Sequence, residues 1–382
     1  MPKDLTLRAA QAKTKKQSSK SSRILAFDLL RGFFLIVIIL NHLGWYPSGF
    51  ELITIGGGLF ASTAEGFFLL SGIVLGIVRG QKLIDKPFKV PAKLLLKRAI
   101  QLYITSVVLM LIFTFIGWAF FMDNPGLKPG IRPIDQPLSE VLFGAFTFNY
   151  IYGWADFLRL YSIYILISPL ALWLLRQGKG YLVLLASASV WWFVDINNIP
   201  LSNELMMVIP WQFIFFSGFV IGFNWEKITN LWHSIAKNWR KIIVVSLNTL
   251  AIITLLLNVI LVLAAPIFPQ LNEIRDALSP YFDKATLPLP RLVLFALWFW
   301  LGFWIFNRYE KQITKYFGWI LIPFGQNSLY VYTIHAFVVF FAHLIMPNPS
   351  AYWAINLLGT LVVLGLVYAA VKTKFLMKII PR

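Results

Sequence analysis

The 382-residue sequence contains no cysteine, and charged residues make up only 13% of it. The absence of cysteine excludes thiolate nucleophiles and metal sites built on cysteine. The sequence also lacks a Walker loop, a dinucleotide-binding glycine fingerprint after a strand, and an HExxH zinc motif. Its four histidines are scattered along the chain. We therefore expect no metal site and none of the soluble enzyme classes that these motifs mark.

Hydrophobic residues, in contrast, make up 58% of the chain and form many runs long enough to cross a bilayer. Because only helices and closed barrels satisfy the backbone inside lipid, helix-length apolar runs predict membrane-spanning helices. The fold class that we expect is all-α, a polytopic membrane helix bundle of about ten transmembrane helices. The predicted spans are 24–43, 60–79, 98–121, 157–176, 181–195, 208–224, 241–265, 290–307, 319–345 and 352–371.

The distribution of positive charge predicts the topology. The formal net charge is +18, which in a soluble protein would suggest a nucleic-acid partner. With a cytoplasmic N-terminus, 27 of the 34 Lys and Arg residues fall in inner segments and five in outer loops. This asymmetry favours two cytoplasmic termini and an even number of spans. We expect a multi-pass protein of the cell (inner or plasma) membrane, whose partner is the lipid bilayer and not nucleic acid.

The same reasoning divides the chain into three parts. Residues 1–23 are basic and polar and predict a disordered cytoplasmic tail. Residues 24–372 form the membrane domain, and 373–382 a short basic cytoplasmic tail. In the long outer loop, residues 138–152 are interpreted as a short re-entrant or interfacial helix, because an eleventh span would invert every later loop.

Ionisable residues within the first predicted span are the most informative feature. Arg31 and His42 are separated by ten residues of one apolar run, and Asp28 lies one turn before Arg31. Burying such groups in lipid costs several kcal/mol, so they are candidates for function. Arg31 and His42 should lie roughly 16 Å apart along the helix axis. An Asp28–Arg31 ion pair at the inner interface and an interfacial His42 are the structural alternatives.

Glu65 lies one turn inside the second span, at the depth expected for His42. Small residues such as Gly72 explain close helix packing in this span, but they do not explain a glutamate. A carboxylate beside His42 could orient the imidazole and stabilise its protonated form. His42 itself could act as a general base near neutral pH. Ser71 is interpreted as a packing residue and not as a nucleophile.

Two later segments carry further polar groups. Asp156, Arg159 and Tyr161 cluster at the outer mouth of the fourth span, where an arginine can also be a simple anchor. His335 lies mid-span after Pro323 and Gly325, which we expect to break the helix, and it needs a polar partner.

Two motifs at the start of the chain resemble the membrane acyltransferase 3 superfamily. Residues 28–32 (DLLRG) followed by His42 are similar to its first-helix motif, a basic residue upstream of a histidine. Residues 64–78 (AEGFFLLSGIVLGIV) followed by 98–103 (RAIQLY) look more like the OpgC branch, the glucan-modifying succinyltransferases. Residues 327–335 (NSLYVYTIH) are similar to a late helix motif of the wider superfamily. The resemblance runs from about residue 24 to 345, and only its first two blocks are specific.

This resemblance implies transfer of an acyl group from cytoplasmic acyl-CoA to a hydroxyl of a periplasmic or cell-surface glycan. Acyl-CoA, as succinyl-CoA or acetyl-CoA, would be a co-substrate, with no tightly bound cofactor. Carried onto this chain, His42 would be the catalytic base and Glu65 its partner. Donor-binding residues would be Arg31, Asp28 and Arg98, and substrate-binding residues would be Arg159, Tyr161 and His335.

Two other functions fit the same residues. In a transporter or flippase of an envelope glycan or lipid, the buried charges would line a substrate path. In a scaffold protein of an envelope complex, they would carry no chemistry. Neither the acyl group nor the acceptor glycan follows from the sequence.

Overall fold

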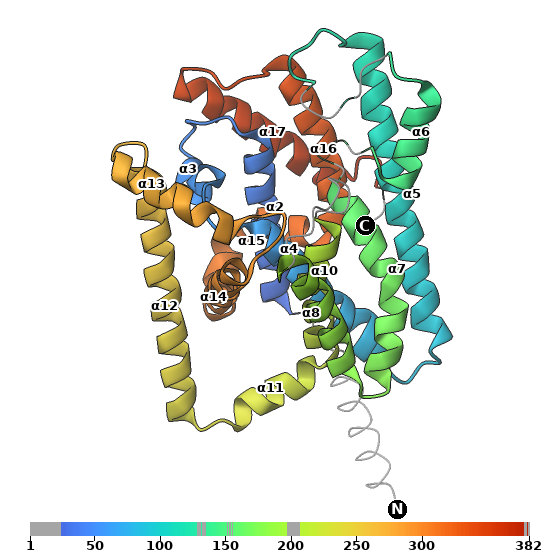
Figure 1. The fold of residues 1–382 in the computed structure, drawn as a ribbon, viewed down its shortest axis with the longest axis vertical. Helices are drawn as coiled ribbons and strands as arrows, with labels where there is room; N and C mark the ends of the chain where they lie inside the picture. The colour runs from blue at the N-terminus through green and yellow to red at the C-terminus, as the bar shows by residue number, and fades with distance from the viewer. Residues whose placement is uncertain are drawn as a thin grey trace, which may run out of the picture.

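The computed structural model describes residues 24–127, 131, 135–150, 152, 154, 156–196, 207–377 and 380. Every regular element within these residues is a helix, and together they form one bundle (Figure 1). The predicted all-α membrane fold is confirmed. The tail expected at residues 1–23 lies outside the described residues, as does part of the tail expected at 373–382.

Among the described residues, eight helices are long and apolar enough to cross a membrane. They are α2 (Leu25–Leu43), α4 (Thr63–Leu75) with its continuation η2 (Gly76–Gly80) and η3 (Gln81–Leu83), α5 (Lys89–Phe120), α7 (Asp156–Arg176), α12 (Lys237–Ala264), α14 (Leu289–Arg308), α16 (Ser328–Ile345) and α17 (Trp353–Thr373). A ninth span results if α10 (Val208–Phe223) is counted with α11 (Trp225–Ser234), to which it is joined at a bend of 71°.

The remaining helices are short or lie between spans. They are α3 (Glu51–Thr54), η1 (Ile55–Gly57), α6 (Leu138–Thr147), α8 (Gly180–Ile196), α13 (Pro269–Leu278), η5 (Ser279–Phe282) and α15 (Glu310–Gln326). The ten residues of α6 are too few to cross a bilayer, so residues 138–152 add no span of their own.

The predicted spans differ from the structure at two places. The run 181–195 forms α8, whose 17 residues are at the lower limit for a membrane span. The run 319–345 is not one span, because it is broken at Asn327 between α15 and α16. Pro323 lacks an amide hydrogen for helical bonding, and the side chain of Asn327 donates to the Pro323 carbonyl at 2.9 Å. Together these residues end α15 and start α16 at a new angle.

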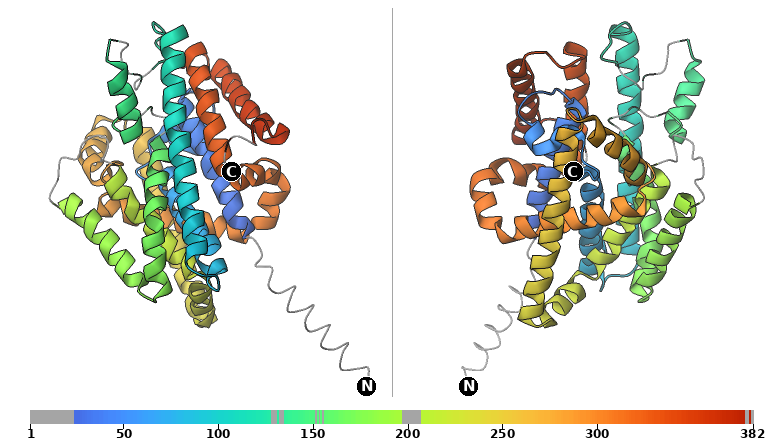
Figure 2. Two further views of the ribbon diagram at one scale, coloured as in Figure 1. Left: turned by 90° about the vertical axis from the view of Figure 1, so that its right-hand side faces the viewer. Right: turned by 60° about the vertical axis from the view of Figure 1, so that its left-hand side comes forward.

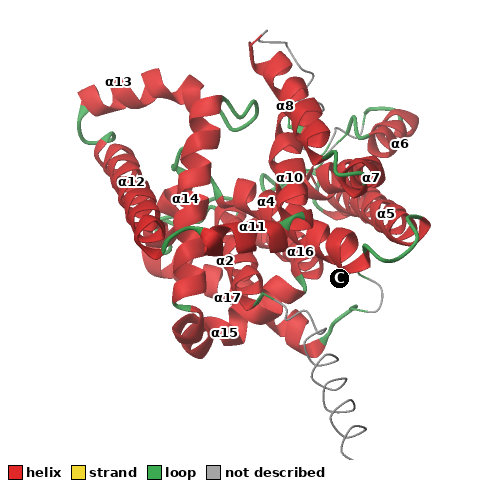
Figure 3. Ribbon diagram, turned by 90° about the horizontal axis from the view of Figure 1, so that it is seen from below, coloured by secondary structure: helices red, strands yellow, loops and turns green. Residues whose placement is uncertain are grey.

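Helix α2 lies at the centre of the bundle. It packs against α15, α16, α4 and α14, and most of its residues are buried. A side chain at Gly32 would collide with the Leu321 carbonyl, and one at Gly325 with the Asp28 carbonyl. Glycine at these two positions lets α15 cross α2 backbone against backbone. Viewed from below, α12 and α14 lie on one side of α2, and α5 and α7 on the other (Figure 3).

Helices α4 and α10 make an equally close contact. Gly72 and Gly76 of α4 and η2 face Gly218 and Gly222 of α10, and a Cβ atom at any of them would overlap the backbone of the opposite helix. Both helices therefore carry a small-xxx-small motif. Because the hydrophobic effect does not drive helices together inside lipid, close van der Waals contact between the two backbones stabilises the pair. Beside this pair, α5 runs along α7 through the full height of the bundle (Figure 2).

The α4–α10 contact gives a stability prediction with a matched control. Gly222→Ala places a methyl group against the Ile73 carbonyl and should destabilise the protein by about 1–3 kcal/mol. Gly365→Ala in α17 has nothing within 4 Å of the new Cβ and should be neutral or stabilising by up to about 1 kcal/mol. Thermal unfolding in detergent measures both. Equal effects of the two substitutions would contradict the close contact.

Candidate functional site

A cavity of about 450 Å³ opens between α2, α4, α5, α7 and α16. Four basic residues line it, Arg31, Arg79, Lys97 and Arg98, and none of its lining residues among those described is acidic. The other lining residues are mainly apolar or aromatic. Such a cavity concentrates positive potential between walls of low dielectric and therefore attracts a polyanion.

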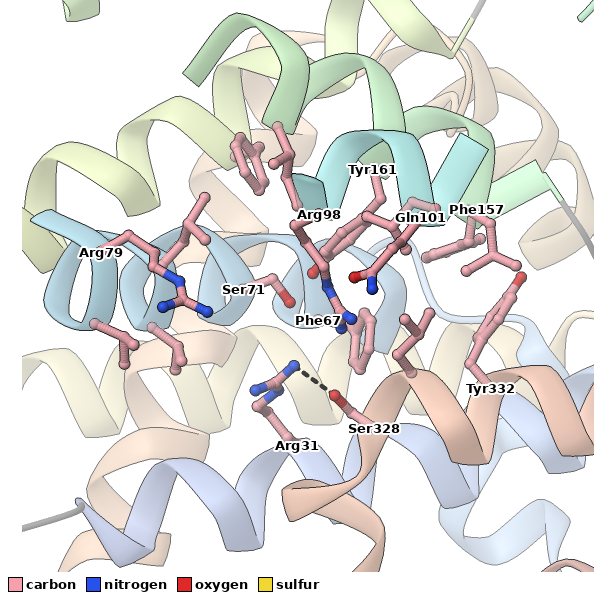
Figure 4. A pocket seen from close by; sticks show the side chains of 18 of the residues that line it. Arg31, Phe67, Ser71, Arg79, Arg98, Gln101, Phe157, Tyr161, Ser328 and Tyr332 are labelled. Atoms are coloured by element: carbon pink, nitrogen blue, oxygen red, sulfur yellow. Dashed lines mark hydrogen bonds between the residues drawn. The ribbon is translucent and has the colours of Figure 1, made fainter. Parts of the chain in front are cut away.

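The basic side chains of this cationic pocket converge. Arg31 and Arg98 direct their guanidinium groups into the same space, and Arg79 lies further along η2 (Figure 4). Nη2 of Arg31 donates to the Ser328 hydroxyl at 2.5 Å, and its guanidinium lies 5.7 Å from the centre of the Phe67 ring. Ser328 is the first residue of α16, so the break at Asn327 places its hydroxyl beside Arg31.

The far wall of the pocket leads to a pair of histidines. Phe157 and Tyr332 line the pocket, and the Tyr332 ring contacts the edge of the His335 ring at 4.7 Å. His335 is completely buried, and its Nε2 lies 3.0 Å from Nδ1 of the half-buried His42. The polar partner that His335 requires is therefore His42, a contact that the sequence did not reveal.

The protons of this pair can be placed in two ways, because either ring can donate across the 3.0 Å contact. Nδ1 of His335 is buried and has no hydrogen-bond partner among the described residues. A hydrogen on Nδ1 of His335 leaves its Nε2 as an acceptor, and His42 then donates from Nδ1. Nε2 of His42 retains a lone pair in this tautomer. That is the arrangement a general base needs.

Aromatic and polar groups fix the C-terminal end of α2. His343 of α16 bonds the His42 carbonyl through Nε2 at 3.1 Å, and its ring stacks on Trp154 at 5.2 Å. The Trp45 indole donates to the Met346 carbonyl at 3.1 Å. Although three histidines approach one another here, the described part of the chain holds no cluster of three or more His, Cys, Asp or Glu that could bind a metal ion.

Glu65 is not the partner of His42 that the sequence predicted. Oε1 of Glu65 accepts hydrogen bonds from Nε and Nη2 of Arg291, and both residues are buried. Oε2 accepts from the backbone and hydroxyl of Ser62, which completes a capping box at the start of α4. Arg291 comes from α14, 226 positions away, so spacing along the sequence could not indicate it. The carboxylate therefore acts as a cap and a buried ion pair.

Of the remaining predicted site residues, some line the cationic pocket and others lie outside its lining. Tyr161 and Arg98 line the cationic pocket with Arg31, so Tyr161 lies with the residues predicted to bind the donor. Arg159 is buried, and its Nη1 donates to the Phe148 carbonyl at 3.5 Å. Asp28 is buried in the first turn of α2 outside the pocket lining. Asp156 accepts a hydrogen bond from the Tyr332 hydroxyl at 3.3 Å, which ties it to the histidine pair.

A comparison with protein families gives a match that covers the whole membrane domain. The model of the family described as "OpgC protein" matches residues 23–379. The chain belongs to the OpgC family. No curated protein and no solved structure matches it.

Membership of the OpgC family implies a membrane acyltransferase that modifies glucans. The match includes the first-helix residues and also α16 with His335, so both members of the histidine pair lie within it. The wider acyltransferase 3 superfamily remains a resemblance. Sequence reasoning missed Arg79, Lys97 and Ser328 as pocket residues. The basic run at 79–98 was the available signal for Arg79 and Lys97.

The buried Glu65–Arg291 ion pair predicts that substitutions of its two residues have non-additive effects on the stability of this OpgC-family protein. Arg291→Met leaves a buried carboxylate without its cation and should destabilise the protein by about 3–5 kcal/mol. Adding Glu65→Gln should restore part of that loss, because it removes the uncompensated charge. Unfolding in detergent measures the cycle, with Arg275→Met on α13 as the outer-loop control. Strictly additive effects would contradict a direct pair.

Proposed function

We propose that this protein moves an acyl group from cytoplasmic acyl-CoA to a hydroxyl of a glycan on the outer side of the membrane. The observation that carries the proposal is the continuous arrangement along α2, from a cationic pocket at Arg31 to a histidine pair at His42. By the distribution of basic residues, the pocket opens towards the cytoplasm and the histidines lie towards the outside. The family assignment supports the reaction class.

The pocket fits the donor in size and charge. Its volume of about 450 Å³ is within the usual range for small-molecule sites. Coenzyme A carries a diphosphate and a further phosphate, which guanidinium groups bind through paired charge-assisted hydrogen bonds. Arg31, Arg79 and Arg98 provide three such groups and Lys97 an ammonium. The apolar wall towards Phe157 and Tyr332 then suits the uncharged pantetheine arm and the thioester.

The histidine pair supplies the chemistry. Nε2 of His42 takes the proton from the acceptor hydroxyl while its oxygen attacks the thioester carbonyl carbon. When the tetrahedral intermediate collapses, the carbon–sulfur bond breaks and the leaving thiolate takes the proton back from His42. In the tautomer that this reaction needs, Nδ1 of His42 donates to Nε2 of His335, 3.0 Å away, and this hydrogen bond holds the imidazole in place. The Tyr161 hydroxyl, in the pocket lining, is a candidate hydrogen-bond donor to the donor molecule.

Three histidine variants test this mechanism. His42→Gln should lower the rate of acyl transfer by about 10²–10⁴-fold, because it removes the general base. His335→Gln should cause a smaller loss, because the base remains but loses its orientation. His233→Gln, in the inner helix α11 and hydrogen bonded to Arg240, is the control and should retain full activity. The measurement is acyl-glucan formation by purified protein with labelled acetyl- or succinyl-CoA.

Two outcomes of this assay would contradict the proposal. Full transfer by His42→Gln would exclude His42 as the base. Movement of glycan across vesicle membranes without any acylated product, from any donor, would instead indicate a transporter.

The cationic pocket gives a separate kinetic prediction. Arg98→Gln should raise KM for acyl-CoA by about tenfold or more, because a charge-assisted bond to phosphate contributes about 1.5–3 kcal/mol. Its kcat should change little, since Arg98 is remote from the histidine pair along the pocket. Arg308→Gln, at the inner end of α14 and outside the pocket lining, is the control. Unchanged KM in the Arg98 variant would place the donor elsewhere.

A further inference from the structure

Lys284, in the segment between η5 and α14, lies at the Trp211 end of a row of aromatic rings that leads to the histidine pair. Nζ of Lys284 lies 6.0 Å from the centre of the Trp211 ring, and the Trp211 indole donates to the Lys284 carbonyl at 2.9 Å. The described part of the chain provides no ion-pair partner for this ammonium group. Lys284 is exposed, and Asp156 is the acidic residue on which its charge acts.

The backbone on both sides of Lys284 is held in place. Asp283 accepts hydrogen bonds from the backbone and the hydroxyl of Thr286, each at 2.8 Å. Partial burial alone would raise the pKa of Asp283, but the Thr286 hydrogen bonds and the nearby Arg291 hold it below its usual value. On the other side, Nη1 of Arg291 donates to the Phe282 carbonyl at 2.6 Å. Since Arg291 is paired with Glu65, this segment is anchored to the start of α4.

A row of aromatic rings connects Lys284 with the histidine pair. The Trp211 ring packs against Phe157 at 6.2 Å, Phe157 against Tyr332 at 5.5 Å, and Tyr332 against His335 at 4.7 Å. Phe157 and Tyr332 also line the cationic pocket. The charge of Lys284 acts electrostatically on both His42 and Asp156. Lys284 thus lies at the Trp211 end of this row and outside the pocket lining, whereas Phe157 and Tyr332 share the pocket with the arginines that would hold the phosphates.

We propose that Lys284 selects acyl groups that end in a carboxylate, such as succinyl, by pairing with that carboxylate while the thioester lies at His42. This inference rests on the proposed acyl transfer. A thioester held by its phosphates at one end would direct its acyl group towards the Trp211 end of the row of aromatic rings. There an anionic terminus gains a partner in Lys284, and an uncharged acetyl group gains nothing. Arg159, the other candidate cation, is buried and hydrogen bonded to the Phe148 carbonyl.

The test is donor competition with charge-altering variants. Purified protein receives succinyl-CoA and acetyl-CoA at equal concentration with glucan oligosaccharides, and mass spectrometry measures the ratio of succinylated to acetylated product. Lys284→Met keeps the apolar stem against Trp211 and should lower kcat/KM for succinyl-CoA by about tenfold or more. Its kcat/KM for acetyl-CoA should stay within about twofold of the wild type, because an uncharged acyl group forms no ion pair with Lys284. Lys284→Arg should restore most of the preference for succinyl.

The controls separate this inference from the proposed function. Arg275→Met removes an outer cation on α13 and should leave the product ratio unchanged. An equal loss with both donors in Lys284→Met, or no change in the ratio, would overturn the role of Lys284 while leaving acyl transfer intact. If the wild type transferred neither acyl group, the proposed function itself would fail. Should Lys284→Met be poorly folded, Lys284→Gln and the charge-retaining Lys284→Arg still give the comparison, and the same ratio in both would count against the proposal.

Discussion

Two ionisable side chains on one membrane helix must each find a polar partner inside the bundle, and the arrangement of the site depends on this constraint. Arg31 and His42 both find that partner on α16, in Ser328 and His335. The two contacts follow one another in the same direction along both helices, so α2 and α16 run parallel. Parallel helices agree with the charge topology, in which both run from the inside to the outside. The partners of the two groups therefore also fix the two ends of the candidate site.

Close helix contacts at glycine residues position the helices around Arg31 and His42. The crossing of α15 over α2 at Gly32 and Gly325 brings the break at Asn327 next to Arg31, and so positions Ser328. The α4–α10 contact fixes the helix that provides Phe67 and Ser71 to the pocket. Through Glu65 and Arg291, the same α4 also anchors the outer segment that carries Lys284. The inner pocket and the outer segment are thus attached to a common helix.

Much of this arrangement could be predicted from the sequence, and the failures have a common physical cause. Hydrophobic runs identified the helices, and the ionisable groups within them identified Arg31, His42 and His335, because charge in lipid is conspicuous. The partners of these groups could not be predicted, since His42–His335 and Glu65–Arg291 join helices far apart in the chain. Glu65 lies at the depth expected for His42 but is held by a different element. Pro323 indicated in the sequence that the span 319–345 is broken. The angle between α15 and α16 could not be predicted, because it depends on how both helices pack against α2.

The central claim is that the donor pocket and the acceptor end open on opposite sides of the membrane. Because the native chain has no cysteine, single-cysteine variants test this directly. In sealed vesicles of known orientation, a membrane-impermeant maleimide should label Lys97→Cys from the cytoplasmic side and Lys284→Cys from the outer side. Added acyl-CoA should protect Lys97→Cys from labelling. Labelling of both cysteines from the same side would contradict this account.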